Sequence, residues 1–214
     1  MDTIKVADAK GMLIYVADRI IQNKGYLTDI DSAIGDGDHG IGMAGGMERV
    51  KEKLNAMEDA DNVYQIFETA GRVMLMSMGG ASGVIFGSLY MAGAKNMEPK
   101  AELTVKDFVE MQKKSLLAIK LRGKAKLGDK TMVDAFEPAV AAMEEYEEAD
   151  LLTVLTKAEE KAREGMEKTK DYQAKYGRAK SLMERAIGYQ DAGATSVWII
   201  LKSMREYVEA YQVI

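Results

Sequence analysis

Apolar residues recur at helical spacing along most of the chain, and this repetition is the feature that most limits the possible folds. Val6, Leu13, Val16 and Ile20 fall on one face of a helix, and a second such stripe runs through 150–170. Only two prolines occur, methionine and alanine are plentiful, and clusters of β-branched residues are scarce. The sequence therefore predicts an all-α fold.

Eight helices are expected, and most connections between them are short, which favours antiparallel neighbours. Thr104 with Asp107 resembles a helix start, and so does Asp150 before an apolar run. No segment repeats at a fixed period and no linker divides the chain, so residues 1–214 are expected to form a single domain. The expected helices span about 3–24, 40–57, 62–78, 81–97, 104–122, 131–148, 150–170 and 194–212.

Composition excludes several classes of protein. A net charge of -5 and a pI near 5.2 leave no basic surplus for nucleic acid. The chain has no cysteine, which excludes a disulfide scaffold and fits a reducing cytosol. Its N-terminus lacks the basic and apolar regions of a signal peptide, and no apolar run approaches the roughly 18 residues of a membrane span. We expect a cytoplasmic protein with neither nucleic acid nor membrane as its partner.

The glycines gather where the helical pattern is interrupted, and the first interruption is also acidic. Residues 31–40 hold three aspartates, three glycines and the only histidine of the chain. Carboxylates a few Å apart repel one another, and a hard divalent cation such as Mg²⁺ removes that repulsion by taking oxygen ligands. Glycines allow the backbone to fold tightly around an ion. A solvated acidic turn is the alternative, because Asp and Gly are ordinary turn residues.

Other familiar sites do not fit this loop. Gly35–Gly40 spells the dinucleotide fingerprint, but no buried strand precedes it, and Asp36 and Asp38 would repel a bare phosphate. An EF-hand register fails from either Asp29 or Asp36, because neither start places Glu at position twelve. One histidine cannot supply the Glu-x-x-His pair of a di-iron bundle, and a thiolate zinc site needs cysteine. A carboxylate Mg²⁺ site remains, and its natural companion ligand is a phosphate.

Three further interruptions each have a functional and a structural interpretation. Met78–Gly83 leads into an apolar helix, so it either presents free N–H groups to phosphate or makes a tight helix–helix turn. Arg122–Met132 is a basic loop that lacks the features of a P-loop. Its three lysines and its arginine could meet phosphate, although a solvated loop is the commoner outcome. The stretch from about Asp171 to Gly193 has the length of a lid or binding loop. Arg178 within it could cap a phosphate, although a surface salt bridge is commoner for a lone arginine.

Together, in this order, these segments resemble the L-subunit family of dihydroxyacetone kinases, the nucleotide-binding half of that enzyme. The resemblance covers essentially the whole chain. One departure is Ala192, where many relatives are expected to have proline. The matching segments are Gly35–Gly40, Gly79–Gly83, Gly128–Asp134, Gly177–Ala179 and Gly188–Ser196.

The resemblance implies a closed barrel of about eight antiparallel helices that binds ADP or ATP with two Mg²⁺ ions at one end. It assigns the metal ligands to Asp31, Asp36 and Asp38. It implies no catalytic nucleophile on this chain. A phosphate contact is favoured for His39 over a phosphohistidine relay. The residues implied for the nucleotide are His39, Gly40, Ile41, Gly42, Ala81, Ser82, Gly123, Met132, Arg178, Asp191, Ala192 and Gly193.

The resemblance also implies a phosphotransferase that works with other subunits. A K-type subunit would hold dihydroxyacetone, and a phosphohistidine protein of the phosphoenolpyruvate-dependent phosphotransferase system would recharge the bound ADP. Pairing of two copies into a homodimer stays open. One alternative is an ATP-dependent kinase subunit for another short ketose or a tetrose. The other is a nucleotide-binding coregulator of a transcription factor.

Overall fold

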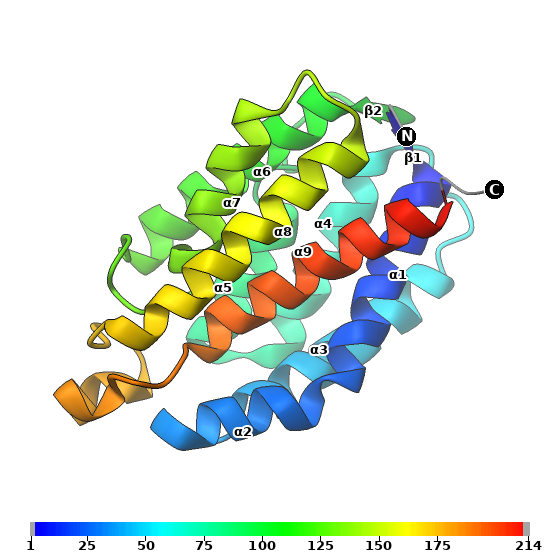
Figure 1. Cartoon of the computed structure of the whole chain (residues 1–214). Coiled ribbons are helices and arrows are strands. Elements are labelled where there is room, and N and C mark those ends of the chain that lie inside the picture. Colours follow the sequence, from blue (N-terminus) through cyan, green and yellow to red (C-terminus); the bar gives the residue numbers. More distant parts are fainter. Residues whose placement is uncertain (1–2, 212–214) are drawn as a thin grey trace.

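The computed structural model describes residues 3–211, and most of them lie in α-helices (Figure 1). Two three-residue strands, β1 (Thr3–Lys5) and β2 (Glu102–Thr104), pair antiparallel with Thr3 opposite Thr104. The helices are α1 (Val6–Gln22), α2 (Lys24–Ile34), α3 (His39–Asn55), α4 (Val63–Met78), α5 (Gly80–Met91), α6 (Val105–Gly123), α7 (Val133–Glu145), α8 (Leu151–Lys168) and α9 (Ala192–Tyr211), with 3-10 turns η1 (Thr169–Asp171) and η2 (Arg178–Ala186).

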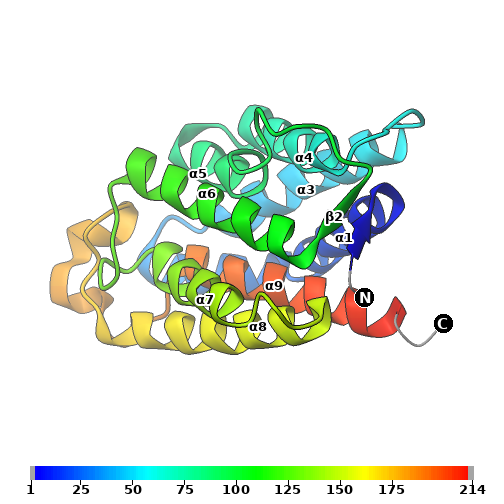
Figure 2. The ribbon, with the colours of Figure 1, turned by 90° about the horizontal axis from the view of Figure 1, so that it is seen from above.

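Eight of these helices form a closed ring, which confirms the expected barrel. Contacts run from α1 to α3, then through α4, α5, α6, α7 and α8 in chain order, and α9 closes the ring against α1. Figure 2 shows α3, α4 and α5 on the side of the molecule opposite α7, α8 and α9. Successive helices of the ring alternate in direction, as short connections favour.

One hydrophobic core fills the ring, and every α-helix contributes to it. Its largest side chains include Tyr64, Phe67, Tyr90, Phe108 and Phe136, all nearly inaccessible to solvent. Burial of apolar surface is the main favourable term in folding, at about 25 cal/mol per Å². A single core shared by all helices makes this one all-α domain. Among the described residues no helix is both long and apolar enough to cross a membrane.

The helix starts predicted from side-chain chemistry are confirmed. Thr104 and Asp107 form a capping box, in which each side chain accepts a hydrogen bond from the other residue's backbone N–H. The Asp150 carboxylate accepts hydrogen bonds from the N–H groups of Leu152 and Thr153 at the start of α8. Each pair satisfies donors that a helix N-terminus otherwise leaves free.

The structure adds one helix that the sequence did not predict. The first predicted helix stops at Asn23, where ψ is 10°, and the chain resumes as α2 rather than as a loop. Only Leu27 and Ile34 of α2 are buried, so its apolar stripe is too thin to recognise by periodicity. Helix α1 also begins later than predicted, because residues 3–5 pair as a β-strand. A strand of three residues is too short to show the alternation of apolar and polar side chains.

Alternating helix directions bring one set of connections to the end opposite the chain termini (Figure 1). This set is the loop before α3, the turn between α4 and α5, the loop between α6 and α7, and the excursion between α8 and α9. These are the same interruptions in which the sequence concentrates glycine. The ring therefore gathers every predicted site segment at one end.

Candidate functional site

Three carboxylates lie together at this end. Asp31 is in the last turn of α2, and Asp36 and Asp38 lie in the loop before α3. One oxygen from each lies within 4.8 Å of the others. Gly37 turns the loop with φ +75°, and a Cβ there would lie 2.6 Å from the Ser32 hydroxyl, so the turn requires glycine.

The electrostatics of this cluster fit a divalent cation. Partial burial, reinforced by the charges of Asp36 and Asp31, raises the pKa of Asp38 above its ordinary value. Desolvation also acts to raise the pKa of Asp36, but the hydrogen bond and the charge of Arg178 outweigh it and lower that pKa. Half-exposed carboxylate oxygens of like charge are the donor set that Mg²⁺ takes.

Helix α3 begins directly against the cluster. The backbone N–H of His39 donates to Asp31 Oδ2 at 3.2 Å. Gly40 is buried against α2, and a Cβ there would overlap Lys24 and Thr28. This close approach fixes the first turn of α3 beside the carboxylates. The N–H of Gly42 donates to the Asp38 carbonyl at 2.9 Å, and the Asp38 side chain makes no capping hydrogen bond. The N–H groups of Gly40 and Ile41 therefore remain available to an anion.

The residues after Gly40 define the rim of the site. Ile41 is 56% exposed, whereas Gly42 faces inward, where a Cβ would lie 3.6 Å from Met78 of α4. An exposed isoleucine next to an acidic loop is available for contact with a ligand or a partner. At 3.6 Å that Cβ would make an ordinary van der Waals contact, so the approach of α3 to α4 does not depend on glycine at position 42.

The imidazole of His39 points toward α9. Its Nε2 lies 2.8 Å from Ser196 Oγ, and its ring centroid is 5.7 Å from that of Phe86. Burial lowers the pKa of His39, although the charge of Asp31 acts in the opposite direction. The ring is therefore mainly neutral near pH 7 and is held between α9 and α5. Sequence reasoning missed Ser196, which stands in the last motif without any local signal that its hydroxyl meets His39.

The second predicted phosphate segment lies at the start of α5. Gly79 and Gly80 both have positive φ, at +66° and +55°, and make the tight turn from α4. Ala81 and Ser82 follow in the first turn of α5 and are exposed. Both interpretations of this segment therefore apply, since a tight turn is also what exposes the N–H groups of the helix.

The basic residues of the loop between α6 and α7 differ in solvent exposure. Lys124 and Lys126 are exposed, whereas the Lys130 side chain is buried. Gly123 ends α6 beside α5, where a Cβ would lie 3.3 Å from Ile85. Met132 is buried next to Gly193 at the start of α9, where a Cβ on that glycine would lie 3.5 Å from the Met132 side chain. The start of this loop therefore lies beside α5, and its end lies beside the turn that precedes α9.

The Asp134 carboxylate organises this loop from within α7. It accepts hydrogen bonds from Gly128 N at 2.6 Å and from Thr131 N at 2.7 Å. Burial raises its pKa, although these backbone hydrogen bonds oppose the shift. Sequence reasoning gave Asp134 no role, and it considered Lys130 only as one of the loop's basic residues, which could meet phosphate or be solvated; the structure buries it instead.

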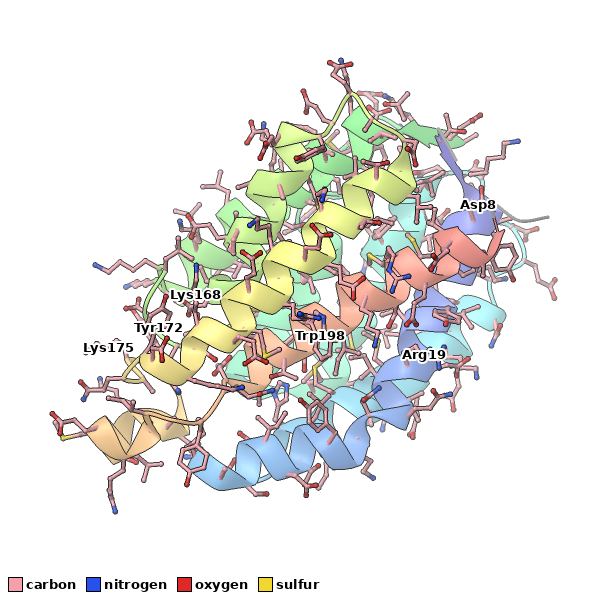
Figure 3. The ribbon with its side chains drawn as sticks, viewed as in Figure 1. Asp8, Arg19, Lys168, Tyr172, Lys175 and Trp198 are labelled. Atoms are coloured by element: carbon pink, nitrogen blue, oxygen red, sulfur yellow. The ribbon has the colours of Figure 1, made fainter. Side chains whose placement is uncertain are left out.

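The excursion between α8 and α9 folds over the carboxylate loop. It leaves the end of α8 near Lys168, Tyr172 and Lys175 (Figure 3). Arg178 Nε donates to Asp36 Oδ2 at 2.7 Å, although the arginine side chain is 77% exposed. Ala174 and Ala186 are buried against Ile34 at the end of α2. A groove of about 520 Å³ between α2 and η2 runs beside this ion pair.

The excursion ends in a turn that also belongs to the predicted site. The Asp191 carboxylate accepts a hydrogen bond from Ala194 N at 2.7 Å in the first turn of α9. Burial raises the pKa of Asp191 to about 7, and the nearby charge of Asp134 adds to the effect of burial. Ala192, where proline is expected in many relatives, is buried at the start of α9.

The structure thus brings the predicted residues to one end of the barrel, in three groups. Asp31, Asp36 and Asp38 form the acidic cluster with Arg178. The first turns of α3 and α5 present free N–H groups, Gly123 lies beside α5, and Met132 lies beside the Asp191–Gly193 turn. The ligand role of each residue stays a prediction.

Comparisons with known proteins agree with this arrangement. The family model of the DAK2 domain matches residues 33–206. The chain is 37% identical to the PEP-dependent dihydroxyacetone kinase 1, ADP-binding subunit DhaL, of Listeria innocua, over 87% of this chain and 89% of that protein. The corresponding DhaL subunit of Escherichia coli is 38% identical, over 84% and 86%.

Longer proteins also match, over only part of their length. The L-erythrulose 1-kinase of Mycolicibacterium smegmatis is 31% identical over 87% of this chain, which spans 33% of that kinase. The crystal structure of the C. freundii dihydroxyacetone kinase in its native form superimposes with a TM-score of 0.74 over 95% of this chain and 35% of that one. At 24% identity this likeness shows the fold alone.

Proposed function

The chain belongs to the DAK2-domain family, and we propose that it is the ADP- and Mg²⁺-binding subunit of a dihydroxyacetone kinase. The observation that carries this proposal is the cluster of Asp31, Asp36 and Asp38 within 4.8 Å, placed against the first turn of α3, where the N–H groups of Gly40 and Ile41 are free. Acidic oxygens for a metal and backbone donors for phosphate stand side by side there. A metal–nucleotide complex needs both kinds of group.

Each group of residues has a distinct task in this proposal. The three aspartates would hold two Mg²⁺ ions, whose charge would neutralise phosphate oxygens and favour phosphoryl transfer. The N–H groups of Gly40 and Ile41 in the first turn of α3, flanked by His39 and Gly42, and those of Ala81 and Ser82 in α5 donate to the phosphates. Gly123, Met132 and the turn Asp191, Ala192 and Gly193 line the nucleotide, and Arg178 covers it. Positioning and charge stabilisation then supply the catalysis, and this chain provides no nucleophile.

The acceptor and the donor belong to other subunits. We propose that a K-type subunit holds dihydroxyacetone and that a phosphohistidine protein of the phosphotransferase system recharges ADP in place. The support is that the relatives named as PEP-dependent ADP-binding subunits match over 86–89% of their own length at 37–38% identity. A cytoplasmic location and a homodimer remain proposals that accompany this one.

Reconstitution tests the proposal. The purified chain is mixed with a K-type subunit, dihydroxyacetone and either a phosphohistidine donor or ATP, and dihydroxyacetone phosphate is measured. Product is expected with the phosphohistidine donor and catalytic ADP, and none when this chain is omitted. Product formed only with stoichiometric ATP would move the chain to the ATP-dependent branch.

The similarity to erythrulose kinases favours one alternative, an ATP-dependent subunit for a tetrose. The same assay distinguishes it when L-erythrulose replaces dihydroxyacetone and ATP is the donor. Faster turnover of the tetrose with ATP would select that alternative. Native mass spectrometry of the purified protein adds an independent observation, because a bound coenzyme is expected to co-purify as ADP.

A further inference from the structure

A buried lysine lies beneath the excursion between α8 and α9 and has no role in the site described above. Lys130 is only 2% exposed and adopts φ +59°, a left-handed conformation that is uncommon for a non-glycine residue. Its amine donates to the Thr169 carbonyl at 2.6 Å and to the Tyr189 carbonyl. Thr169 follows the end of α8 and Tyr189 precedes α9, so one amine joins the two ends of the excursion.

Other hydrogen bonds close the same base. Gly188 N donates to the Lys170 carbonyl at 2.7 Å, and Asp191 N donates to Thr169 Oγ1 at 2.9 Å. The loop that carries Lys130 is tied to the excursion by its backbone as well, since Lys175 N donates to the Asp129 carbonyl at 3.1 Å. Residues 172–188 are thus held by these contacts at their base and by three contacts beyond it: the Arg178–Asp36 ion pair, the packing of Ala174 and Ala186 on Ile34, and the hydrogen bond that Tyr176 Oη donates to the Lys124 carbonyl at 2.8 Å.

Beyond this base the excursion has little packing. Only Ala174 and Ala186 in 172–188 are buried, and its charged side chains Lys175, Arg178, Lys180 and Arg185 are exposed. Segments with few buried apolar contacts open locally at low free-energy cost. With so few contacts beyond the base, the hydrogen bonds at the base contribute strongly to holding the excursion over the carboxylate cluster.

We propose that Lys130 is a positioning residue that clamps both ends of residues 172–188 and so keeps this segment closed over the nucleotide site. The inference rests on the proposed function for its nucleotide, but the clamp itself rests only on the contacts of the chain. A lid that stays closed excludes water and slows ligand release.

The chemistry of Lys130 suits a clamp better than a ligand for phosphate. Burial lowers the pKa of its amine, and the charges of Asp191, Asp134 and Asp171 counteract that shift. Within residues 3–211 no carboxylate oxygen lies within 4.0 Å of the amine, so its hydrogen bonds go to backbone carbonyls rather than to an ion-pair partner. A lysine amine has three N–H donors at the end of a long side chain, so one lysine can hydrogen-bond to two separate segments of backbone.

The test compares Lys130→Met, which keeps the length of the side chain but removes its donors, with Lys126→Met in the same loop. Lys126 is exposed and is the matched control. Limited trypsin digestion of nucleotide-free protein measures opening of the segment, because Lys175, Arg178, Lys180 and Arg185 all lie within it. Cleavage within 172–188 is expected to become about tenfold faster in Lys130→Met than in wild type, the effect of losing one or two net hydrogen bonds. Cleavage elsewhere and the Lys126→Met control are expected to stay as in wild type.

Release of a fluorescent ADP analogue in the presence of Mg²⁺ gives the second readout. It is expected to be about tenfold faster in Lys130→Met, in proportion to the population of the open segment. Thr169→Val removes the hydroxyl that accepts the hydrogen bond from Asp191 N. It is expected to speed cleavage and release in the same direction, so the proposal can still be tested if Lys130→Met does not fold.

Three outcomes separate the possibilities. Unchanged cleavage within 172–188 in the folded variants would overturn the clamp. Faster cleavage with unchanged release of the ADP analogue would overturn its role at the nucleotide site. If wild type binds no ADP analogue at all, the proposed function fails, and the cleavage rates alone decide whether Lys130 is a clamp.

Discussion

At the scale of single residues, the acidic loop is the most demanding part of the chain. Asp36 and Asp38 lie together with Asp31 because α2 ends and α3 begins on either side of a four-residue loop. Neither carboxylate supports the core, since both are exposed. The electrostatic repulsion between these carboxylates is unfavourable, so their placement indicates that they bind a ligand rather than stabilise the fold.

Asp36→Asn and Asp38→Asn are expected to weaken binding of Mg²⁺ and ADP by about two orders of magnitude or more, because each removes a formal charge from a hard-cation site. Helix content is expected to stay unchanged. Isothermal titration calorimetry with ADP and Mg²⁺ measures the binding, and Asp29→Asn on the exposed face of α2 is the control. Wild-type binding by either variant would disprove the metal assignment.

Asp191 predicts a pH dependence of stability. Its folded pKa is raised to about 7, whereas a free Asp titrates near pH 3.9. Between these values the unfolded chain releases a proton that the folded chain keeps. The contribution of Asp191 is therefore full below about pH 4 and is lost as the pH rises through about 7.

Asp191→Asn has no such proton to release. The stability of wild type relative to this variant is expected to fall by about 2–3 kcal/mol between about pH 5 and pH 8. Urea denaturation of the nucleotide-free proteins at the two pH values measures the difference. A stability difference independent of pH would show that Asp191 is ionised throughout this range.

At the scale of helices, close approach depends on where a glycine stands. Gly165 of α8 lies against the backbone at the start of α7, and a Cβ there would overlap the Asp134 carbonyl oxygen. Gly45 of α3 is also helical but has no atom within 4 Å of the corresponding position. The two glycines have the same local conformation and different surroundings.

Gly165→Ala is expected to destabilise the protein by about 1–3 kcal/mol, because α8 must move away from α7. Gly45→Ala is expected to be neutral or to stabilise by up to about 1 kcal/mol, because alanine favours the helix. Chemical denaturation measures both. Equal effects of the two substitutions would mean that helix propensity, and not the approach of α8 to α7, decides the outcome.

At the scale of the whole molecule, a ligand at the end of the ring touches several elements at once. The candidate residues come from α2, α3, α5, the α6–α7 loop, the excursion and α9. A nucleotide that binds only the folded state stabilises it by mass action. Addition of ADP with Mg²⁺ is therefore expected to raise the melting temperature by several degrees.

Removal of Mg²⁺ with a chelator is expected to reverse that rise. Differential scanning fluorimetry follows both changes, and ADP without metal is the control. A melting temperature that does not respond to ADP with Mg²⁺ would count against a coenzyme that bridges these elements.

Retention of ADP is a property of the closed molecule. A subunit whose ADP is recharged in place has no need to release it in each cycle, and a lid slows release. In the reconstituted assay, labelled ADP on the chain is expected to exchange with free nucleotide far more slowly than dihydroxyacetone is phosphorylated. Exchange as fast as turnover would favour ATP as the donor.

The sequence by itself determined what depends on near neighbours. Helical stripes, the Thr104 and Asp150 caps and the glycine-rich interruptions are local patterns, so the ring helices and the acidic loop could be predicted from them. Helix α2 was not predicted, because only two of its residues are buried and its apolar periodicity is therefore too weak to recognise. The assignment of the nucleotide residues depended on resemblance rather than on any local pattern.

Only the tertiary structure decided which distant residues meet. His39 reaches Ser196 across 157 positions, Arg178 reaches Asp36 across 142, and Lys130 reaches Thr169 and Tyr189 across 39 and 59. The sequence around Lys130 gives no sign that it is buried. The carbonyl oxygens that accept hydrogen bonds from its amine belong to residues that follow α8 and precede α9. Closure of the ring brings those ends together, and that closure is a property of the packed core rather than of any one segment.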